Sequence, residues 1–197
     1  MNDLMAMMLV LATVLHTSLA LLPAAVSPAL PASPTASRWV SYWYSPGNSS
    51  TISREHNRLT LALLKKEGGN KVATSLMLYC GDVIREDGTF GPGASPSCDM
   101  LIPELDTMGI GAERIVGAKT ITALRAMWTK HEADSIAAMV ALTKKHKLRG
   151  MSWDVEPSGS NKADAVAYAG YLGKLRQALK PLNARLTTCE SVIAPSA

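Results

Sequence analysis

The stretch RGMSWDVEPSGS, residues 149–160, decides how the rest of the chain is interpreted. Successive side chains of a strand point to opposite faces, so Ser152, Asp154 and Glu156 would share one face, with Gly150 at its base. The other face is apolar and would pack on helices: it carries Met151, Trp153 and Val155. The stretch therefore predicts a strand over 148–156 that ends in two carboxylates, just before Pro157 and a polar loop.

Outward from this stretch, helix-length and strand-length segments alternate. Strands are expected at 39–44, 71–79, 114–118, 148–156 and 185–190, with a long loop at 81–97. Helices are expected at 53–67, 99–108, 133–146 and 163–179, with a helical turn or two at 121–128. Asn161 and Asp164 have the spacing of a helix cap. The order βαβαβαβαβ predicts the α/β class, with a parallel sheet covered by helices.

The spacing of Asp154 and Glu156 suits acid catalysis. Two strand positions rise about 6.6 Å, a gap that two carboxyl side chains can bridge. Two carboxyls in contact cannot both ionise cheaply, so one is favoured as a proton donor near neutral pH. They would lie at the carboxyl end of a parallel strand, where such folds hold ligands. The alternative is that both are loop charges facing water.

The segment GMSWDVEP, residues 150–157, resembles the fourth-strand signature D-G-x-D-x-D-x-E of family 18 glycoside hydrolases, the chitinase-like enzymes. SRWVSYWYS (37–45) and YAGYLGKLRQALKPLNARLTT (168–188) also resemble that family. The resemblance implies a (β/α)₈ TIM barrel acting on N-acetylglucosamine polymers or N-glycans. Glu156 would protonate the leaving oxygen, and Asp154 would orient the acetamido group of the sugar, which acts as nucleophile. No metal or organic cofactor is implied.

The chain departs from that family in two ways. Arg149 and Ser152 stand where the signature has aspartates, and a serine cannot share a proton with Asp154 as a carboxylate would. A TIM barrel needs about 250 residues, so residues 38–197 are expected to be a partial barrel, truncated after the fifth strand. We expect this chain alone to be inactive. The alternatives are a catalytically inactive carbohydrate-binding relative (chi-lectin-like), a non-functional fragment, or another D-x-E barrel hydrolase such as a muramidase.

Further candidates for sugar contact come from the ends of other strands. Tyr42 and Trp43 in the aromatic first strand could stack on a sugar or fill a core. Tyr42 is preferred, because the resemblance implies an inward tyrosine there. Ser152 is a further candidate, and Glu190 could line the same mouth or be a solvated charge. Asp82, at the end of the second strand, is similarly ambiguous.

The N-terminal region indicates an exported protein. Residues 4–22 carry no charge and suit a signal peptide, 1–20, cleaved after Ala20, or else an uncleaved membrane anchor. Residues 21–37 are a linker rich in Pro, Ala and Ser. Cys80 and Cys98 are the plausible disulfide, which leaves Cys189 over. Asn48 begins a glycosylation tripeptide.

Charge and motifs argue against several other classes. The net charge of +4 comes from scattered Lys and Arg rather than one patch, so no nucleic-acid partner is expected. The partner is instead an oligosaccharide or polysaccharide, with a membrane involved only if residues 4–22 remain as an anchor. No C-x-x-C, phosphate-binding loop or paired-histidine helix indicates a metal or nucleotide site.

Overall fold

The computed structural model describes residues 41–47, 50–155 and 159–188. The chain divides into two compact units, Met1–Arg38 and Trp39–Ala197, and every described residue belongs to the second. The predicted signal peptide or anchor and the linker lie outside the described residues. Among the described helices, none has both the length and the apolar character that crossing a membrane requires.

The second unit is built on a parallel sheet whose strands follow one another in chain order, β1-β2-β4-β5-β6. These strands span Ser41–Tyr44, Ser75–Ile84, Gly111–Ala118, Gly150–Asp154 and Arg185–Thr188. A short strand, β3 (Phe90–Gly91), pairs antiparallel with β2. Neighbours in sequence that are also neighbours in the sheet are typical of a (β/α) barrel, whereas doubly wound folds reverse their strand order. The predicted α/β partial barrel is confirmed.

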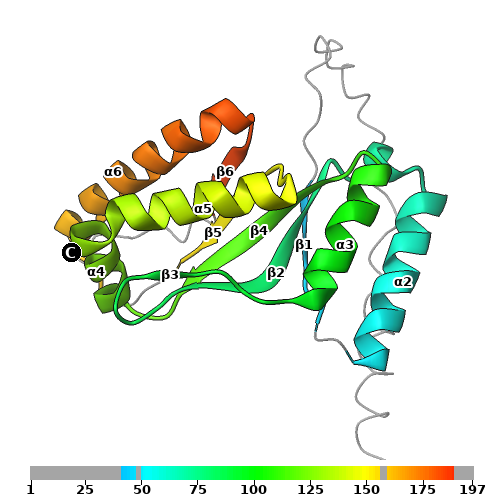
Figure 1. Cartoon of the computed structure of the whole chain (residues 1–197), viewed down its shortest axis with the longest axis horizontal. Coiled ribbons are helices and arrows are strands. Elements are labelled where there is room, and N and C mark those ends of the chain that lie inside the picture. Colours follow the sequence, from blue (N-terminus) through cyan, green and yellow to red (C-terminus); the bar gives the residue numbers. More distant parts are fainter. Residues whose placement is uncertain (1–40, 48–49, 156–158, 189–197) are drawn as a thin grey trace, which may run out of the picture. The chain divides into compact units, whose positions relative to one another are not determined.

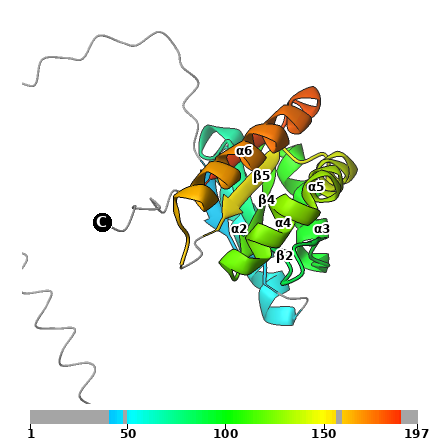
Figure 2. The same cartoon turned by 90° about the vertical axis from the view of Figure 1, so that its left-hand side faces the viewer.

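Five helices connect the parallel strands, and Figure 1 shows them along one face of the sheet. They are α2 (Thr51–Lys66), α3 (Pro96–Thr107), α4 (Ile121–Lys130), α5 (Glu132–His146) and α6 (Lys162–Leu179). The pairs α2 with α3 and α5 with α6 lie side by side, and α4 contacts both α5 and α6. Figure 2, a view turned by 90°, shows β4 and β5 behind α4, α5 and α6.

Four of these helices begin at a residue whose side chain accepts a hydrogen bond from the first turn: Ser50, Ser95, Thr120 and Asn161. The predicted cap of α6 is confirmed as a reciprocal capping box between Asn161 and Asp164. Asp164 also binds Arg125 of α4 through two hydrogen bonds of 2.8 and 2.7 Å. The start of α6 is therefore fixed both by its own cap and by its neighbouring helix.

The chain turns into the next strand through a left-handed residue at four places. These residues are Gly68, Gly109, Lys147 and Asn183, with φ of 98°, 69°, 51° and 52°. Each precedes one of the strands β2, β4, β5 and β6. A glycine or asparagine adopts this conformation at low cost, whereas a lysine is an uncommon choice for it.

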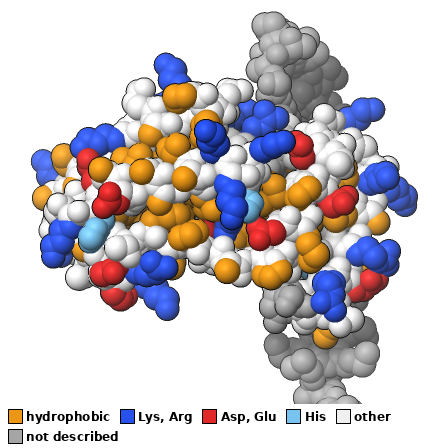
Figure 3. All heavy atoms as spheres, viewed as in Figure 1, with side chains coloured by type: hydrophobic (Ala, Val, Ile, Leu, Met, Phe, Trp, Pro, Cys, Tyr) orange, Lys and Arg blue, Asp and Glu red, His pale blue; other side chains and the backbone are white. Residues whose placement is uncertain are grey.

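The core lies between the helices and the face of the sheet that they cover. Trp153 and Met151 of β5 are fully buried there, together with Leu76 and Leu78 of β2. The ring of Trp153 packs edge-on against Tyr168 and Tyr171 of α6, at centroid distances of 6.3 and 5.5 Å. The predicted alternation of β5 is thus confirmed on its apolar side. In Figure 3, blue Lys and Arg side chains are spread over the outside of the helices.

Several boundaries differ from the sequence expectation. β2 starts at Ser75 rather than at 71 and continues to Ile84, so part of the predicted loop 81–97 is a hairpin with β3. A tight turn closes this hairpin, with the Thr89 N–H donating to Asp87 Oδ1 at 2.9 Å. The predicted turn or two at 121–128 is the full helix α4. Strand signals in the hairpin were hidden by its glycines and charges, which are typical of loops.

Candidate active site

The face of the sheet opposite the helices carries the polar residues of the strands. Strand pairing places Trp43 opposite Met77, and Gly117 opposite Asp154. Residues paired in a parallel sheet point to the same side, and side chains alternate along each strand. The inner face therefore includes Trp43, Ser75, Met77, Glu113, Ile115, Ser152, Asp154 and Thr187. This is the face on which the sequence placed its candidate carboxylates.

Asp154 ends β5 at the carboxyl edge of the sheet and is half-buried. Its Oδ2 accepts a hydrogen bond from the hydroxyl of Tyr79 on β2. β4 lies between these two strands. A carboxylate has acceptor capacity for several donors, so Asp154 retains capacity for a ligand.

The two aromatic candidates in β1 lie on opposite faces. Trp43 is 48 % exposed, and its ring contacts Tyr79 edge-on at 5.5 Å between centroids. Tyr42 is on the same face as Tyr44, whose hydroxyl donates to Asn57 Oδ1 of α2 at 2.7 Å. The expectation of an inward Tyr42 is therefore wrong. Alternation along β1 directs Tyr42 to the helix-covered side and directs Trp43 to the inner face, beside Tyr79.

Ser152 shares the inner face with Asp154 but is fully buried. Its hydroxyl lies 3.4 Å from the sulfur of Met77, to which it donates. A fully buried hydroxyl does not favour contact with a sugar, and substrate binding at Ser152 stays a prediction. The position is a packing site between β5 and β2.

Three predicted site residues fall outside the described residues. They are Glu156, the expected acid, Glu190, the expected mouth residue, and Asn48, the expected glycosylation site. The structure does describe the disulfide that the sequence favoured, between Cys80 of β2 and Cys98 of α3, with 5.9 Å between their Cα atoms. Cys189 also lies outside the described part of the chain.

A buried carboxyl at the other end of the inner face was not expected from the sequence. Glu113 is fully buried, and its two oxygens accept hydrogen bonds from Ser75 and Thr187, each at 2.9 Å. Burial raises the pKa of Glu113, and the two hydroxyls oppose that rise. Glu113 therefore ties β2, β4 and β6 together. A glutamate directly before the predicted strand 114–118 is the sequence signal that could have indicated it.

The ambiguity of Asp82 is resolved on the helix-covered face. Asp82 accepts two hydrogen bonds from the guanidinium of Arg114, at 2.7 and 2.9 Å, and a third from the Gly93 N–H at 2.8 Å. Arg114 also donates to the Gly93 carbonyl at 2.8 Å. Burial raises the pKa of Asp82, while the charge of Arg114 opposes the rise. This pair binds the loop before α3 to the sheet and faces away from the mouth.

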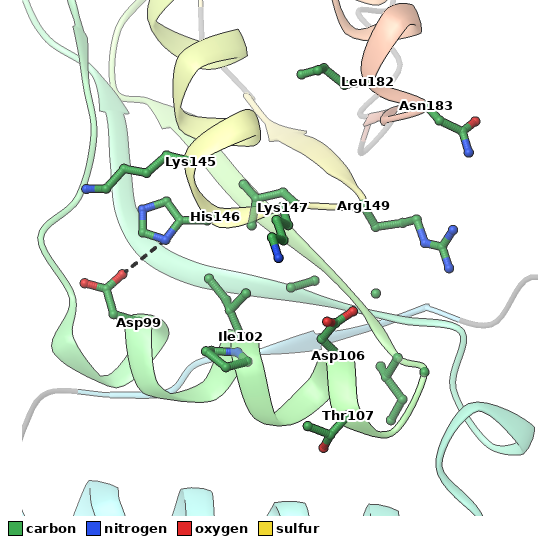
Figure 4. A pocket seen from close by; sticks show the side chains of 16 residues that line it. Asp99, Ile102, Asp106, Thr107, Lys145, His146, Lys147, Arg149, Leu182 and Asn183 are labelled. Atoms are coloured by element: carbon green, nitrogen blue, oxygen red, sulfur yellow. Dashed lines mark ion pairs between the residues drawn. The ribbon is translucent and has the colours of Figure 1, made fainter.

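A hollow of about 760 Å³ lies at the amino ends of β4 and β5, away from Asp154. Figure 4 shows Asp99 and His146 pointing toward one another among its lining residues, with 3.7 Å between His146 Nδ1 and Asp99 Oδ1. Lys145 belongs to the last turn of α5, whereas Lys147 and Arg149 come from the turn between α5 and β5. In (β/α) barrels this end serves stability and the carboxyl end carries chemistry. The hollow is therefore not the candidate site.

Within the described residues, no three of the His, Cys, Asp and Glu side chains are grouped as a metal site would require.

Tyr79, which binds Asp154, was not predicted as a site residue, because the sequence shows it only as the last residue of a predicted strand. An aromatic residue at a strand end is too common to single out.

Comparison with known proteins supports the fold. The sequence matches no family model and no curated protein. Among solved structures, the chain resembles the C-terminal domain of a putative chitinase from Desulfitobacterium hafniense DCB-2 (TM-score 0.61, 15 % identity, 76 % of this chain and 45 % of that one). It also resembles a class V chitinase from Pseudomonas fluorescens Pf-5 (0.60, 14 %, 76 % and 44 %). A third is a chitinase from Chromobacterium violaceum ATCC 12472 (0.57, 14 %, 76 % and 44 %).

At these identities the likeness concerns the fold alone. The chain spans less than half the length of each of these chitinases.

Proposed function

We propose that this chain contains the acid catalyst, Glu156, and its partner Asp154 of a chitinase-like glycoside hydrolase that acts on glycans containing N-acetylglucosamine. One observation supports this most directly. Asp154 ends its strand half-buried on the inner face and is bound by Tyr79, whose ring in turn contacts the half-exposed Trp43. A carboxylate with free acceptor capacity beside aromatic rings suits a sugar that carries an amide.

In the proposed reaction Glu156 gives its proton to the glycosidic oxygen as the bond from that oxygen to the anomeric carbon breaks. The acetamido oxygen of the same sugar forms a new bond to that carbon, so no second enzyme carboxylate acts as nucleophile. Asp154 accepts the acetamido N–H and holds the group in line. Water then displaces the acetamido oxygen from the anomeric carbon and returns a proton to Glu156. No metal or organic cofactor enters these steps.

The aromatic rings offer the apolar face that a sugar requires. Trp43 is 48 % and Tyr79 is 40 % exposed, and both strands end at the edge where Asp154 lies. Aromatic faces pack on the C–H faces of sugar rings, while their edges leave the hydroxyls free. We propose that Trp43 supplies such a face, with Tyr79 turned toward the carboxylate.

A second candidate function is that of an inactive carbohydrate-binding relative, which the burial and the hydrogen bond of Ser152 favour. This hydroxyl is buried on the inner face and donates to the sulfur of Met77, so it does not support Asp154. A site lacking that support would bind the sugar without cleaving it.

Export of the protein is a further proposal. The Cys80–Cys98 disulfide supports it, because such bonds persist in oxidising compartments.

The test compares binding and hydrolysis of chitotetraose by the complete product of the gene and by its Glu156→Gln variant. We expect the variant to keep its affinity and to lose turnover by about 10²–10⁴-fold, the usual contribution of a general acid. Glu67→Gln, an exposed glutamate at the end of α2, is the matched control and should change neither.

Equal binding without turnover in wild type and variant would instead identify the carbohydrate-binding relative. Turnover of peptidoglycan without turnover of chitotetraose would identify a muramidase. Turnover of chitotetraose by residues 1–197 alone would contradict the expectation that this chain is inactive by itself.

A further inference from the structure

β2 contains an irregular segment directly beside the candidate site. It pairs with β4 in register from Ser75 to Leu78 and again from Asp82 to Ile84, with a shift between the two parts. The residues in the shift are Tyr79, Cys80 and Gly81, and Gly81 has a φ of 85°. Irregularities of this kind turn a side chain away from its regular direction and are frequent beside active sites. The residue at the start of this one is Tyr79.

Two contacts hold the irregular segment in place. Cys80 is joined by its disulfide to Cys98 in the first turn of α3, so the segment is tied covalently to a helix. Gly93 lies so close that a Cβ there would come within 1.9 Å of the Cys80 carbonyl oxygen. The backbone on the far side of Cys80 is therefore closely packed, and Tyr79 extends from a fixed base.

From this base Tyr79 reaches across the sheet. Its hydroxyl binds Oδ2 of Asp154 although β4 lies between the two strands, a span of about two strand spacings or roughly 9–10 Å. The residue of β4 paired with Asp154 is Gly117, and a Cβ there would meet only the Asp154 carbonyl oxygen, at 3.9 Å. With no side chain at Gly117, nothing on β4 at that level separates the phenol from the carboxylate.

The polar neighbour of Asp154 on β5 does not bind its carboxylate. Ser152, two residues earlier on the same face, directs its hydroxyl to Met77. Within the described residues, the side-chain hydrogen bond recorded for the Asp154 carboxylate is that from Tyr79. Because this bond involves Oδ2, Oδ1 remains as an acceptor for an N–H donor.

We propose that Tyr79 is the positioning residue of Asp154, held in place by the disulfide-anchored irregularity of β2, and that it presents Oδ1 to the amide N–H of a bound N-acetyl sugar. This assignment rests on the proposed function. A tyrosine from the second strand then performs the support that the chain lacks at Ser152.

The test uses Tyr79→Phe, which keeps the ring that contacts Trp43 and removes only the hydroxyl. Tyr42→Phe, on the other face of β1, is the matched control. The first measurement is the carbon-13 resonance of the Asp154 carboxyl, which we expect to move in Tyr79→Phe and to stay in Tyr42→Phe. The double variant Cys80→Ser/Cys98→Ser should move the same resonance in the same direction.

The second measurement is hydrolysis of chitotetraose by the complete gene product. We expect Tyr79→Phe to lower kcat about tenfold, the size of one lost hydrogen bond to a charged group, with KM within about twofold. A merely structural role would lower the folded fraction and leave the kcat of the folded enzyme unchanged. An unmoved Asp154 resonance, or an unchanged kcat, overturns the assignment.

The two measurements separate this assignment from the proposed function. If the wild type neither binds nor cleaves chitotetraose, the proposed function fails. The Asp154 resonance then decides by itself whether Tyr79 positions the carboxylate.

Discussion

Asp82 and Asp154 are carboxylates on opposite faces of one sheet, and their surroundings differ sharply. Asp82 faces the helices with a side chain that is 0 % exposed, and its two oxygens accept three hydrogen bonds from Arg114 and Gly93. Asp154 faces the other way and is half-buried, and from the described side chains it accepts a hydrogen bond from Tyr79.

The difference distinguishes a carboxylate that holds the fold from one that is available to a ligand. Asp82 has no exposed surface, and its partners use its acceptor capacity. Asp154 has exposed surface and acceptor capacity that its protein partner does not use. Both were candidates in the sequence, where an aspartate near a strand end gives no indication of the face to which it turns. Variants on the helix-covered face should therefore lose stability, and variants at Asp154 should lose activity.

The largest effect on stability is expected at Arg114. Arg114→Ala leaves the charge of Asp82 buried without its partner, which should cost about 3–5 kcal/mol of unfolding free energy. Urea denaturation measures this loss. The double variant Asp82→Asn/Arg114→Met keeps an acceptor for the Gly93 N–H without burying a charge, so it should be more stable than Arg114→Ala. A double variant as unstable as the single one would contradict the assigned cost.

An intermediate effect is expected at Glu113, the buried carboxyl at the amino end of the inner face. Burial raises its pKa above the ordinary 4.5, so the folded state holds this proton more tightly than the unfolded state. Glu113 therefore makes the fold lose stability as the pH rises from about 4.5 through its folded pKa. Glu113→Gln carries no such proton, so its free energy of unfolding should fall less over the same pH range.

The measurement compares urea unfolding of wild type and Glu113→Gln at pH 4 and pH 8. For each protein, the free energy of unfolding at pH 8 is subtracted from that at pH 4, and the two results are compared. Carboxyls present in both proteins then cancel, such as Asp164, whose pKa is lowered by its hydrogen bond to Arg125. An identical pH dependence in the two proteins would show that Glu113 does not cause the loss of stability at higher pH.

The smallest effect on stability is expected at Asp154. Asp154→Asn should change the free energy of unfolding by less than about 1 kcal/mol, because the group is half-buried and an amide oxygen still accepts from Tyr79. The same variant should lose most of its hydrolysis of chitotetraose. A large loss of stability with normal hydrolysis would place Asp154 with Asp82 as a structural carboxylate.

The sequence predicted the parts of this molecule that follow from local pattern. Alternation around Trp153 and Asp154 assigned the two faces of β5, and Asn161 with Asp164 located the start of α6. It failed where side-chain direction depends on contacts distant in the chain. Tyr42 was placed inward by resemblance, but strand pairing turns Trp43 inward instead. Tyr79 acquires its role from a register shift and a glycine on another strand, which no local pattern contains.

Three of the four left-handed residues, Gly109, Lys147 and Asn183, stand within three residues of the strand that follows them, whereas a short 3₁₀ helix, Gly69–Lys71, separates Gly68 from β2. All four bends lie at the amino edge of the sheet, opposite the edge where Asp154 lies. In (β/α) barrels the amino edge serves stability, so substitutions at these bends should alter folding and leave the carboxylate at the other edge in place.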